Sequence, residues 1–246
     1  WQLGAAGGHT ARVAEANERY FALQRMGSDW VGNPDLDPAR NTGLEFSATW
    51  THAGATVGAQ AFASRVDGYI AVYDQARVQM VPGVMNAAAR TYANVDARLT
   101  GGELTASLPA GSRVFVSGDV SYVRGSQSGD VSRGIAEGAL AEMPALRARA
   151  RVRFDDGRWF AVAEEVVTGD QRRVDVSLGE APTPGAAVTH LSGGLRWRQV
   201  SLTVGVTNLF DRFYVDALSY QRDPFRSGVR LPEPGRQWFS NVTWRF

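Results

Sequence analysis

The chain has no cysteine and no lysine among its 246 residues. The absence of cysteine excludes a disulfide framework and a metal site built on thiolates. No run approaches the roughly 18 consecutive apolar residues that a membrane-spanning helix needs. Twenty-six arginines against 25 carboxylates leave a formal net charge of +1, which argues against nucleic acid as a partner. The length allows one large all-β domain or two small domains, so the architecture must be inferred from the residue pattern.

The final segment of the chain alternates between apolar and polar positions. Trp238, Val242, Trp244 and Phe246 share one parity with Ser240, and mostly polar residues lie between them. A period of two predicts a strand with one apolar face and one polar face. Similar stretches that read as strands lie at residues 3–12, 44–50, 55–73, 88–108, 114–122, 146–154, 159–168, 187–197 and 200–207.

Short turns and long loops alternate between these predicted strands. The short turns lie near His52, Ala110, Asp156 and Arg198, and the long loops lie around Gly27, Met80, Gln127, Ala181 and Pro224. This rhythm is typical of an outer-membrane barrel, whose strands present apolar residues to lipid and polar residues to the lumen. We therefore predict an all-β fold, an antiparallel up-and-down transmembrane β-barrel meander of about ten strands that is part of a larger barrel.

Two details of the pattern refine this prediction. Helix formers without period two predict one short helix within Ala14–Leu23. The apolar parity of the strand at residues 88–108 changes across Gly101 and Gly102, which predicts a β-bulge there. On the face predicted to meet lipid we place Trp50, Val114, Val116, Val204, Val242 and Trp244; on the opposite face we place Arg149, Arg151, Thr203 and Thr243.

Two motifs resemble those of TonB-dependent outer-membrane receptors. Asn208, Leu209 and Phe210, followed after a loop by Gly235, Arg236 and an aromatic strand, resemble the C-terminus of that family. Asn33 and Pro34, within Gly-Asn-Pro-x-Leu-x-Pro, resemble an internal signature of the family. The segments 18–23 and 218–224 look most like the branch of copper receptors. Trp244 and Phe246 occupy positions similar to the signal that the barrel-assembly machinery reads.

The resemblance implies a barrel of about 22 strands with a plugged lumen, of which residues 1–246 supply the C-terminal portion without the plug. It implies active import of a metal ion or metal chelate, copper or a ferric siderophore, across the outer membrane of a Gram-negative cell. The implied partners are the TonB complex, acting through the missing plug, the barrel-assembly machinery, the lipid bilayer and the metal or chelate. Since the chain opens on Trp1 without a signal peptide, we expect upstream sequence. A passive porin-like barrel and a soluble β-rich binding module stay open as alternatives.

Arg147, Arg149, Arg151 and Arg153 form the most distinctive charged pattern, because their alternation with apolar residues points all four to one face. An arginine at the bilayer midplane costs roughly 2–4 kcal/mol, so we predict that these side chains face the lumen. One interpretation is ion pairing within the lumen, with Glu164, Glu165 or Asp119 as partners. The other is contact with an acidic plug or guidance of anions.

Candidate metal ligands are few. Met80 and Met85, like Met26 and Met143, lie in predicted long loops, and thioethers suit Cu(I), although loop methionines also fill gaps in packing. His9, His52 and His190 show no ligand spacing. No catalytic constellation is recognisable, so we expect neither an enzyme nor a bound cofactor.

Overall fold

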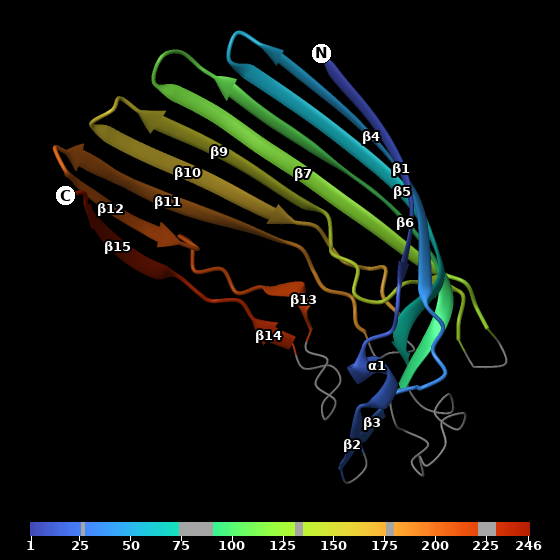
Figure 1. Cartoon of the computed structure of the whole chain (residues 1–246). Helices are drawn as coiled ribbons and strands as arrows, with labels where there is room; N and C mark the ends of the chain where they lie inside the picture. Colours follow the sequence, from blue (N-terminus) through green and yellow to red (C-terminus); the bar gives the residue numbers. More distant parts are fainter. Residues whose placement is uncertain (26–27, 74–90, 131–134, 176–179, 221–229) are drawn as a thin grey trace.

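A continuous antiparallel meander dominates the computed structural model, which describes residues 1–25, 28–73, 91–130, 135–175, 180–220 and 230–246. Ten strands pair in the order β1-β4-β5-β6-β7-β9-β10-β11-β12-β15, and the short β8 pairs with β7 beside this path. Figure 1 shows the meander as a curved open sheet with β1 and β15 near its two sides. The predicted all-β meander of about ten strands is confirmed.

The strands of the meander are β1 (Gln2–Arg12), β4 (Ala39–His52), β5 (Ala55–Tyr73), β6 (Thr91–Pro109), β7 (Val114–Gln127), β9 (Arg147–Asp155), β10 (Trp159–Thr168), β11 (Ala186–Trp197), β12 (Val200–Thr207) and β15 (Gln237–Trp244). The other elements are α1 (Ala16–Tyr20), β2 (Ala22–Arg25), β3 (Ser28–Val31), β8 (Gly138–Ala139), β13 (Val215–Tyr220) and β14 (Arg230–Pro232). Among the described residues, no helix is long and apolar enough to cross a membrane.

The short turns at one end of the sheet follow from local backbone chemistry. Ala53 and Gly54 join β4 to β5 with φ angles of 48° and 81°, and positive φ at both positions is what a two-residue type I′ hairpin requires. Gly157, with φ of 91°, closes the β9–β10 turn, and Arg198, with φ of 53°, closes the β11–β12 turn. The short turns predicted from the sequence are confirmed at these positions.

Cross-strand register gives the sheet two chemically different faces. Val200 lies opposite Trp244 and Leu202 lies opposite Val242, so apolar residues align from strand to strand. We call this side the apolar face; it includes Phe46, Trp50, Val57, Leu104, Val116, Val152, Phe154, Leu191, Leu202, Val204, Val242 and Trp244. The other side is the polar face; it includes Ser47, Gln60, Glu103, Asp119, Arg149, Arg151, Glu164, His190, Thr203, Asn241 and Thr243.

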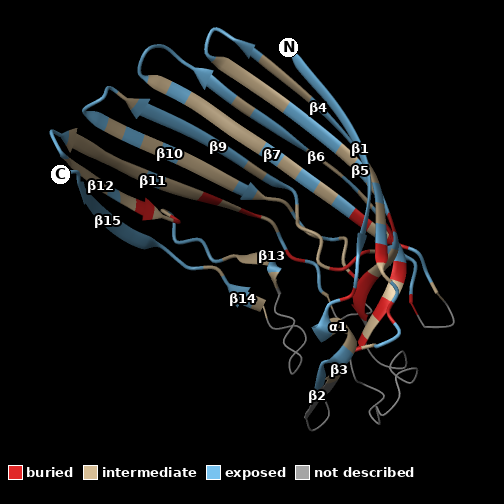
Figure 2. Ribbon diagram, viewed as in Figure 1, coloured by how far each residue is buried: buried red, intermediate tan, exposed pale blue. Residues whose placement is uncertain are grey.

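The apolar face is uncovered. Val204 is 50% exposed, Val242 is 66% exposed and Trp244 is 67% exposed. Figure 2 shows pale blue and tan along most of the meander, with the red of buried residues concentrated toward the long-loop end of β5, β6 and β7. A contiguous exposed apolar surface of this kind marks an interaction with a membrane or another apolar partner.

The buried core lies at the long-loop end, where the loops pack on the strands. Leu36 and Leu140, from two different loops, are 3% and 1% exposed and cluster with Val66 and Ala97 of the sheet. Met143 and Leu99 pack against the same cluster. The loops at this end are therefore held by apolar contacts with the strands.

Three details differ from the sequence predictions. The helix is shorter than residues 14–23, because β2 begins at Ala22 and pairs with β3 where an irregular loop was expected. The prediction of a bulge at Gly101 and Gly102 is wrong, since the pairing of β6 continues without a shift through both. The register shift lies between Val66 and Tyr69, beside Gly68 with φ of +71°.

Candidate functional site: the polar face of the sheet

A row of arginines on β9 forms the centre of the polar face. Register places Arg147, Arg149, Arg151 and Arg153 opposite Ser121, Asp119, Ser117 and Phe115 of β7. All four therefore share the polar face, although whether this face lines a lumen stays a prediction. Because all four lie on β9, each arginine is flanked across the sheet by residues of β7 and β10 and not by another arginine of the row.

Carboxylates on neighbouring strands partner two of these arginines. Arg149 donates from Nε to Asp119 Oδ1 at 2.8 Å, and Arg151 donates from Nε to Glu164 Oε2 at 2.8 Å. Both bonds lie at cross-strand positions in direct register. The arginine side chains are 47% and 46% exposed, so the ion pairs fix orientation more than they stabilise the fold.

Glu165 is not a partner of the arginine row. Its carboxylate lies on the apolar face and accepts a hydrogen bond from Thr189 Oγ1 at 2.5 Å. The suggestion that Glu165 pairs with an arginine is therefore wrong, because adjacent residues of a strand point to opposite faces. Arg147 has no ion pair among the described residues, which leaves its charge available at the long-loop end of β9.

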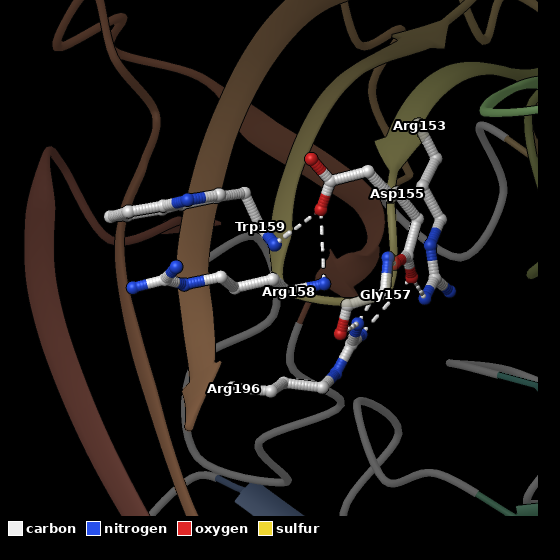
Figure 3. A network of polar contacts seen from close by, with 7 residues as sticks. Arg153, Asp155, Gly157, Arg158, Trp159 and Arg196 are labelled. Carbon is white, nitrogen blue, oxygen red and sulfur yellow. Dashed lines mark hydrogen bonds and ion pairs between the residues drawn. The ribbon is translucent and has the colours of Figure 1, made fainter. Parts of the chain in front are cut away.

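Asp155 organises the short-turn end of the row. Arg196 donates from Nη1 to Asp155 Oδ1 at 2.8 Å and from Nη2 to Oδ2 at 3.1 Å, while Arg153 bonds the same carboxylate. Figure 3 shows Arg153 and Arg196 converging on Asp155 at the β9–β10 turn. The guanidinium of Arg196 also lies 4.7 Å from the centroid of the Phe160 ring. This end of the polar face is locked by charge-assisted bonds that join β9 to β11.

Acidic and histidine side chains extend the polar face on both sides of the row. On β4 and β5, Gln60 donates to Glu45 at 2.7 Å, and Glu103 of β6 lies directly opposite Gln60. On β11, His190 lies opposite Glu164, and its Nδ1 accepts from the backbone N–H of Asn208 at 3.2 Å. The charge of the polar face therefore changes across the sheet, from carboxylates on β4–β6 to arginines on β9.

The C-terminal signature residues meet in one hydrogen-bonded cluster after β12. Asn208 is 3% exposed; its Nδ2 donates to the carbonyls of Arg212 and Pro234, and its Oδ1 accepts from the Arg212 N–H. Arg236 donates its backbone N–H to Asp211 Oδ1 at 2.7 Å. A Cβ at Gly235 would lie 2.7 Å from that same oxygen, so a larger residue there would have to displace the Asp211 carboxylate. These contacts bring residues 208–211 and 234–236 together.

Two further signature residues take peripheral places in this cluster. Leu209 donates its N–H to the Thr189 carbonyl at 2.9 Å, while Phe210 is 75% exposed. The cluster therefore holds the end of β12 against the start of β15 through backbone and amide groups, and the ring of Phe210 has no part in it.

The Gly-Asn-Pro signature near the N-terminus forms a second cluster, whose contacts could not be predicted from the sequence. Asn33 Nδ2 donates to the Tyr92 carbonyl at 3.0 Å, and Arg19 of α1 donates to the carbonyls of Pro34 and Leu36. Arg12 holds α1 through two 2.9 Å bonds to Glu18. The segment that looks like the copper-receptor branch therefore packs directly on the Gly-Asn-Pro signature.

Metal-ligand candidates are only partly visible. Met80 and Met85, together with Met26, lie outside the described residues. Met143 is described and packs against the apolar cluster around Leu140, which is the gap-filling role. No group of three or more histidine, aspartate or glutamate side chains within the described ranges could hold a metal ion.

The family described as TonB dependent receptor-like, beta-barrel, matches residues 5–209. The chain belongs to this family. Its members are transport proteins of the Gram-negative outer membrane, and the resemblance inferred from the sequence motifs is thereby confirmed.

Solved structures agree with this assignment. The copper transporter OprC superposes on 99% of the chain with a TM-score of 0.80 and 25% identity, and 37% of OprC is covered. The ferric enterobactin receptor PfeA of Pseudomonas aeruginosa, as a complex with BCV-L6, covers 98% of the chain at 19% identity with a TM-score of 0.72. The siderophore receptor PirA of the same organism covers 98% at 15% identity with a TM-score of 0.68.

The chain spans between 37% and 39% of the length of these three structures. No curated protein matches the chain.

Proposed function

We propose that residues 1–246 are the C-terminal barrel portion of an outer-membrane receptor that actively imports a metal ion or metal chelate. The TonB complex would supply energy through a plug that lies outside this chain. The likeness to the copper transporter OprC, over 99% of the chain at a TM-score of 0.80, is the observation that carries this proposal. The family match over residues 5–209 supports the same membrane and the same class of transport.

The two faces of the sheet support a membrane orientation. The apolar face would meet lipid, because its exposed valines and aromatics would lose contact with water there. The polar face would line the lumen, with Arg147, Arg149, Arg151 and Arg153 turned inward, since each arginine in lipid would cost roughly 2–4 kcal/mol. In this orientation the arginine row would meet the plug or an anionic chelate, and Arg147 is the member with no ion pair in the described part of the chain.

Copper is the proposed cargo ahead of a ferric siderophore. OprC is the one of the three structures reported above that reaches 25% identity, whereas the two siderophore receptors lie at 19% and 15%. Met80 and Met85 remain candidate ligands, because thioethers bind Cu(I) and both residues fall in the sequence between β5 and β6, where a long loop is predicted. Trp244 and Phe246 would act earlier, as the signal for the barrel-assembly machinery.

Uptake by cells tests this proposal. The chain is expressed in its natural reading frame, with any residues that flank it, in a host that lacks its own copper and siderophore receptors. Accumulation of radioactive copper and of a radioactive ferric chelate is then compared in cells with and without a functional TonB. Copper uptake that requires TonB is the expected result. Equal uptake without TonB would mean a passive porin-like barrel, and absence from outer-membrane fractions would contradict the membrane assignment.

Matched methionine variants test the ligands. Replacing Met80 and Met85 by leucine should lower copper uptake at limiting copper, because leucine keeps the volume but has no sulfur. The control is Met143→Leu, whose side chain packs against the Leu140 cluster. Equal uptake by all variants would remove the two loop methionines as ligands.

A further inference from the structure

Three arginines occupy the apolar side of the sheet on adjacent strands, beyond the end of its apolar residues. Arg65 of β5 lies directly opposite Arg98 of β6, and Arg124 of β7 lies opposite Thr100, two residues from Arg98. All three are exposed. These arginines continue the apolar parity of their strands, since Arg65 comes two residues after Ala63 and Arg124 two residues after Tyr122.

The neighbours of these arginines fix the direction in which the three side chains point. Val66 and Ala97, which lie next to Arg65 and Arg98, are 6% and 2% exposed and pack in the cluster with Leu140. A Cβ at Gly125, next to Arg124, would lie 2.6 Å from Met143 Sδ. The loops therefore cover the polar face at this level, and the arginines project from the opposite face.

The residues beneath the arginines indicate their level. Tyr122 precedes Arg124 on the same face and is 42% exposed, and Leu104 and Val120 follow at 51% and 40%. Exposed aromatic residues form the girdles of a barrel at the membrane–water interface. If Tyr122 belongs to such a girdle in the proposed membrane orientation, the arginines one step beyond it, at the long-loop end, would lie at the level of the lipid headgroups of the outer leaflet.

The charges in this region are incompletely matched. Like charges directly opposite across two strands destabilise a sheet, as Arg65 and Arg98 would without a counter-ion. Arg65 Nε bonds Asp67 at 2.8 Å, and the Asp96 carboxylate accepts the Gly68 N–H at 3.1 Å. The side chains of Arg98 and Arg124 have no hydrogen bond or ion pair among the described residues.

A hollow of about 450 Å³ lies between these side chains. Four arginines line it, Arg173 with the other three, against two carboxylates, Asp96 and Glu137. Guanidinium groups bind phosphate oxygens through paired N–H donors, so a cluster of arginines favours a phosphate over a simple anion. The hollow is therefore suited to a phosphate group that approaches along the apolar face.

We propose that Arg65, Arg98 and Arg124 bind the phosphate of an outer-leaflet lipid headgroup, whose acyl chains lie along the apolar face. This inference rests on the proposed membrane location. A lipid fits better than free phosphate, because the exposed Tyr122, Leu104 and Val120 lie where its chains would run. The phosphate of the bound lipid would reduce the repulsion between Arg65 and Arg98. The lipid would also anchor the rim of the barrel in one leaflet.

The test measures lipid retained by the purified protein. The protein is expressed in its natural reading frame and extracted from membranes in mild detergent. It is then incubated with a bisphosphorylated glucosamine-disaccharide lipid, and the lipid that stays bound is measured by native mass spectrometry. Parallel samples contain the dephosphorylated lipid or inorganic phosphate alone. An arginine near an anionic surface contributes about a fivefold change in affinity, so we expect about fivefold weaker retention for Arg98→Gln and on the order of a hundredfold for the triple variant.

Controls separate recognition from folding and from the proposed function. Arg98→Lys keeps the charge without the paired N–H donors, so it should retain more lipid than Arg98→Gln and less than the wild type. Arg172→Gln removes an exposed loop arginine and should retain all of the lipid. Each variant is first shown to fold by its heat-modifiable migration in gels. Equal retention by the triple variant, equal retention of the dephosphorylated lipid, or equally tight binding of inorganic phosphate would overturn the inference. These results would leave metal uptake intact, whereas absence of the wild type from outer-membrane fractions would refute the proposed function itself.

Discussion

Glu164 and Glu165 are adjacent in β10, yet their carboxylates lie on opposite faces of the sheet. Glu164 accepts from Arg151 on the polar face, and Glu165 accepts from Thr189 on the apolar face, where it lies opposite Ala150. If the apolar face meets lipid, one carboxylate lies in an aqueous lumen beside a cation and the other in the bilayer beside a hydroxyl. Substitutions at these two glutamates can therefore test which face of the sheet meets lipid.

Neutralising each glutamate should change stability in opposite directions. Glu164→Gln removes the ion pair with Arg151 and should lower the free energy of unfolding by about 0.5–1 kcal/mol, as expected for a partly exposed pair. Glu165→Gln keeps an oxygen for Thr189 and removes a charge from lipid, so it should raise the free energy of unfolding by about 1 kcal/mol. Urea unfolding in lipid vesicles, followed by tryptophan fluorescence, measures both. A loss of stability with Glu165→Gln would argue against a lipid-facing apolar surface.

Much of the meander could be predicted from the sequence, because barrel strands carry their pattern locally. A period of two marks strands such as 159–168, and an Asp-Gly pair marks the turn at Gly157. The β2–β3 hairpin and the β13–β14 ribbon carry no such alternation, although each pairs segments that are close in the chain. The sequence therefore predicts the wall of the sheet better than its loops.

The change of parity in β6 shows why the bulge prediction failed. From Thr91 to Ala97 the buried residues of β6 lie on the polar face, where the loops cover them. From Leu104 to Leu108 the apolar residues lie on the opposite, exposed face. The burial environment changes while the backbone register continues. Local sequence cannot show this, because the covering residues Leu36 and Leu140 come from other parts of the chain. For the same reason, the contacts of the cluster around Asn208 could not be predicted from the sequence.

The C-terminal signature cluster should be sensitive at its amide and tolerant at its ring. Asn208→Ala leaves the carbonyls of Arg212 and Pro234 and the Arg212 N–H without their partner, which should cost about 1–3 kcal/mol. Phe210→Ser should cost less than about 0.5 kcal/mol, since that side chain is 75% exposed. Thermal unfolding of the detergent-solubilised protein compares them. A larger loss for Phe210→Ser would show that the signature acts through its aromatic ring.

Phe62, on the polar face, covers a glycine on the next strand and provides a packing test. Phe62 lies opposite Gly101, and a Cβ at Gly101 would lie 2.6 Å from Phe62 Cε1 and 2.7 Å from the Tyr122 carbonyl. Because the carbonyl cannot move freely, Gly101→Ala should cost about 1–3 kcal/mol. Gly8→Ala is the control, since nothing lies within 4 Å of its Cβ position. Equal behaviour of the two variants in urea unfolding would mean that Phe62 does not pack on Gly101.

The aromatics of the last strand should affect assembly more than stability. Replacing Trp244 and Phe246 by serine should reduce folded protein in outer-membrane fractions several-fold, because both residues occupy the positions that resemble the assembly signal. Val242→Ala, in the same strand and 66% exposed, should reduce it little. Heat-modifiable migration of the membrane fraction provides the measurement. Equal losses in both variants would indicate that the strand acts only through packing.

The β9–β10 turn should be sensitive to acid through Asp156. Its Oδ1 accepts from the Trp159 N–H at 2.7 Å and from the Arg158 N–H at 3.0 Å, and these bonds lower the pKa of the Asp156 carboxyl. A carboxyl whose pKa is lowered by folding stabilises the folded state above its unfolded pKa of about 3.9 and loses that contribution as the pH falls. We therefore expect exchange of the Trp159 amide proton to accelerate, relative to its intrinsic rate, below about pH 4. Asp156→Asn keeps an acceptor oxygen without titrating, so its protection should not vary with pH in this window. If the wild type and Asp156→Asn lose protection in parallel, another group controls the turn.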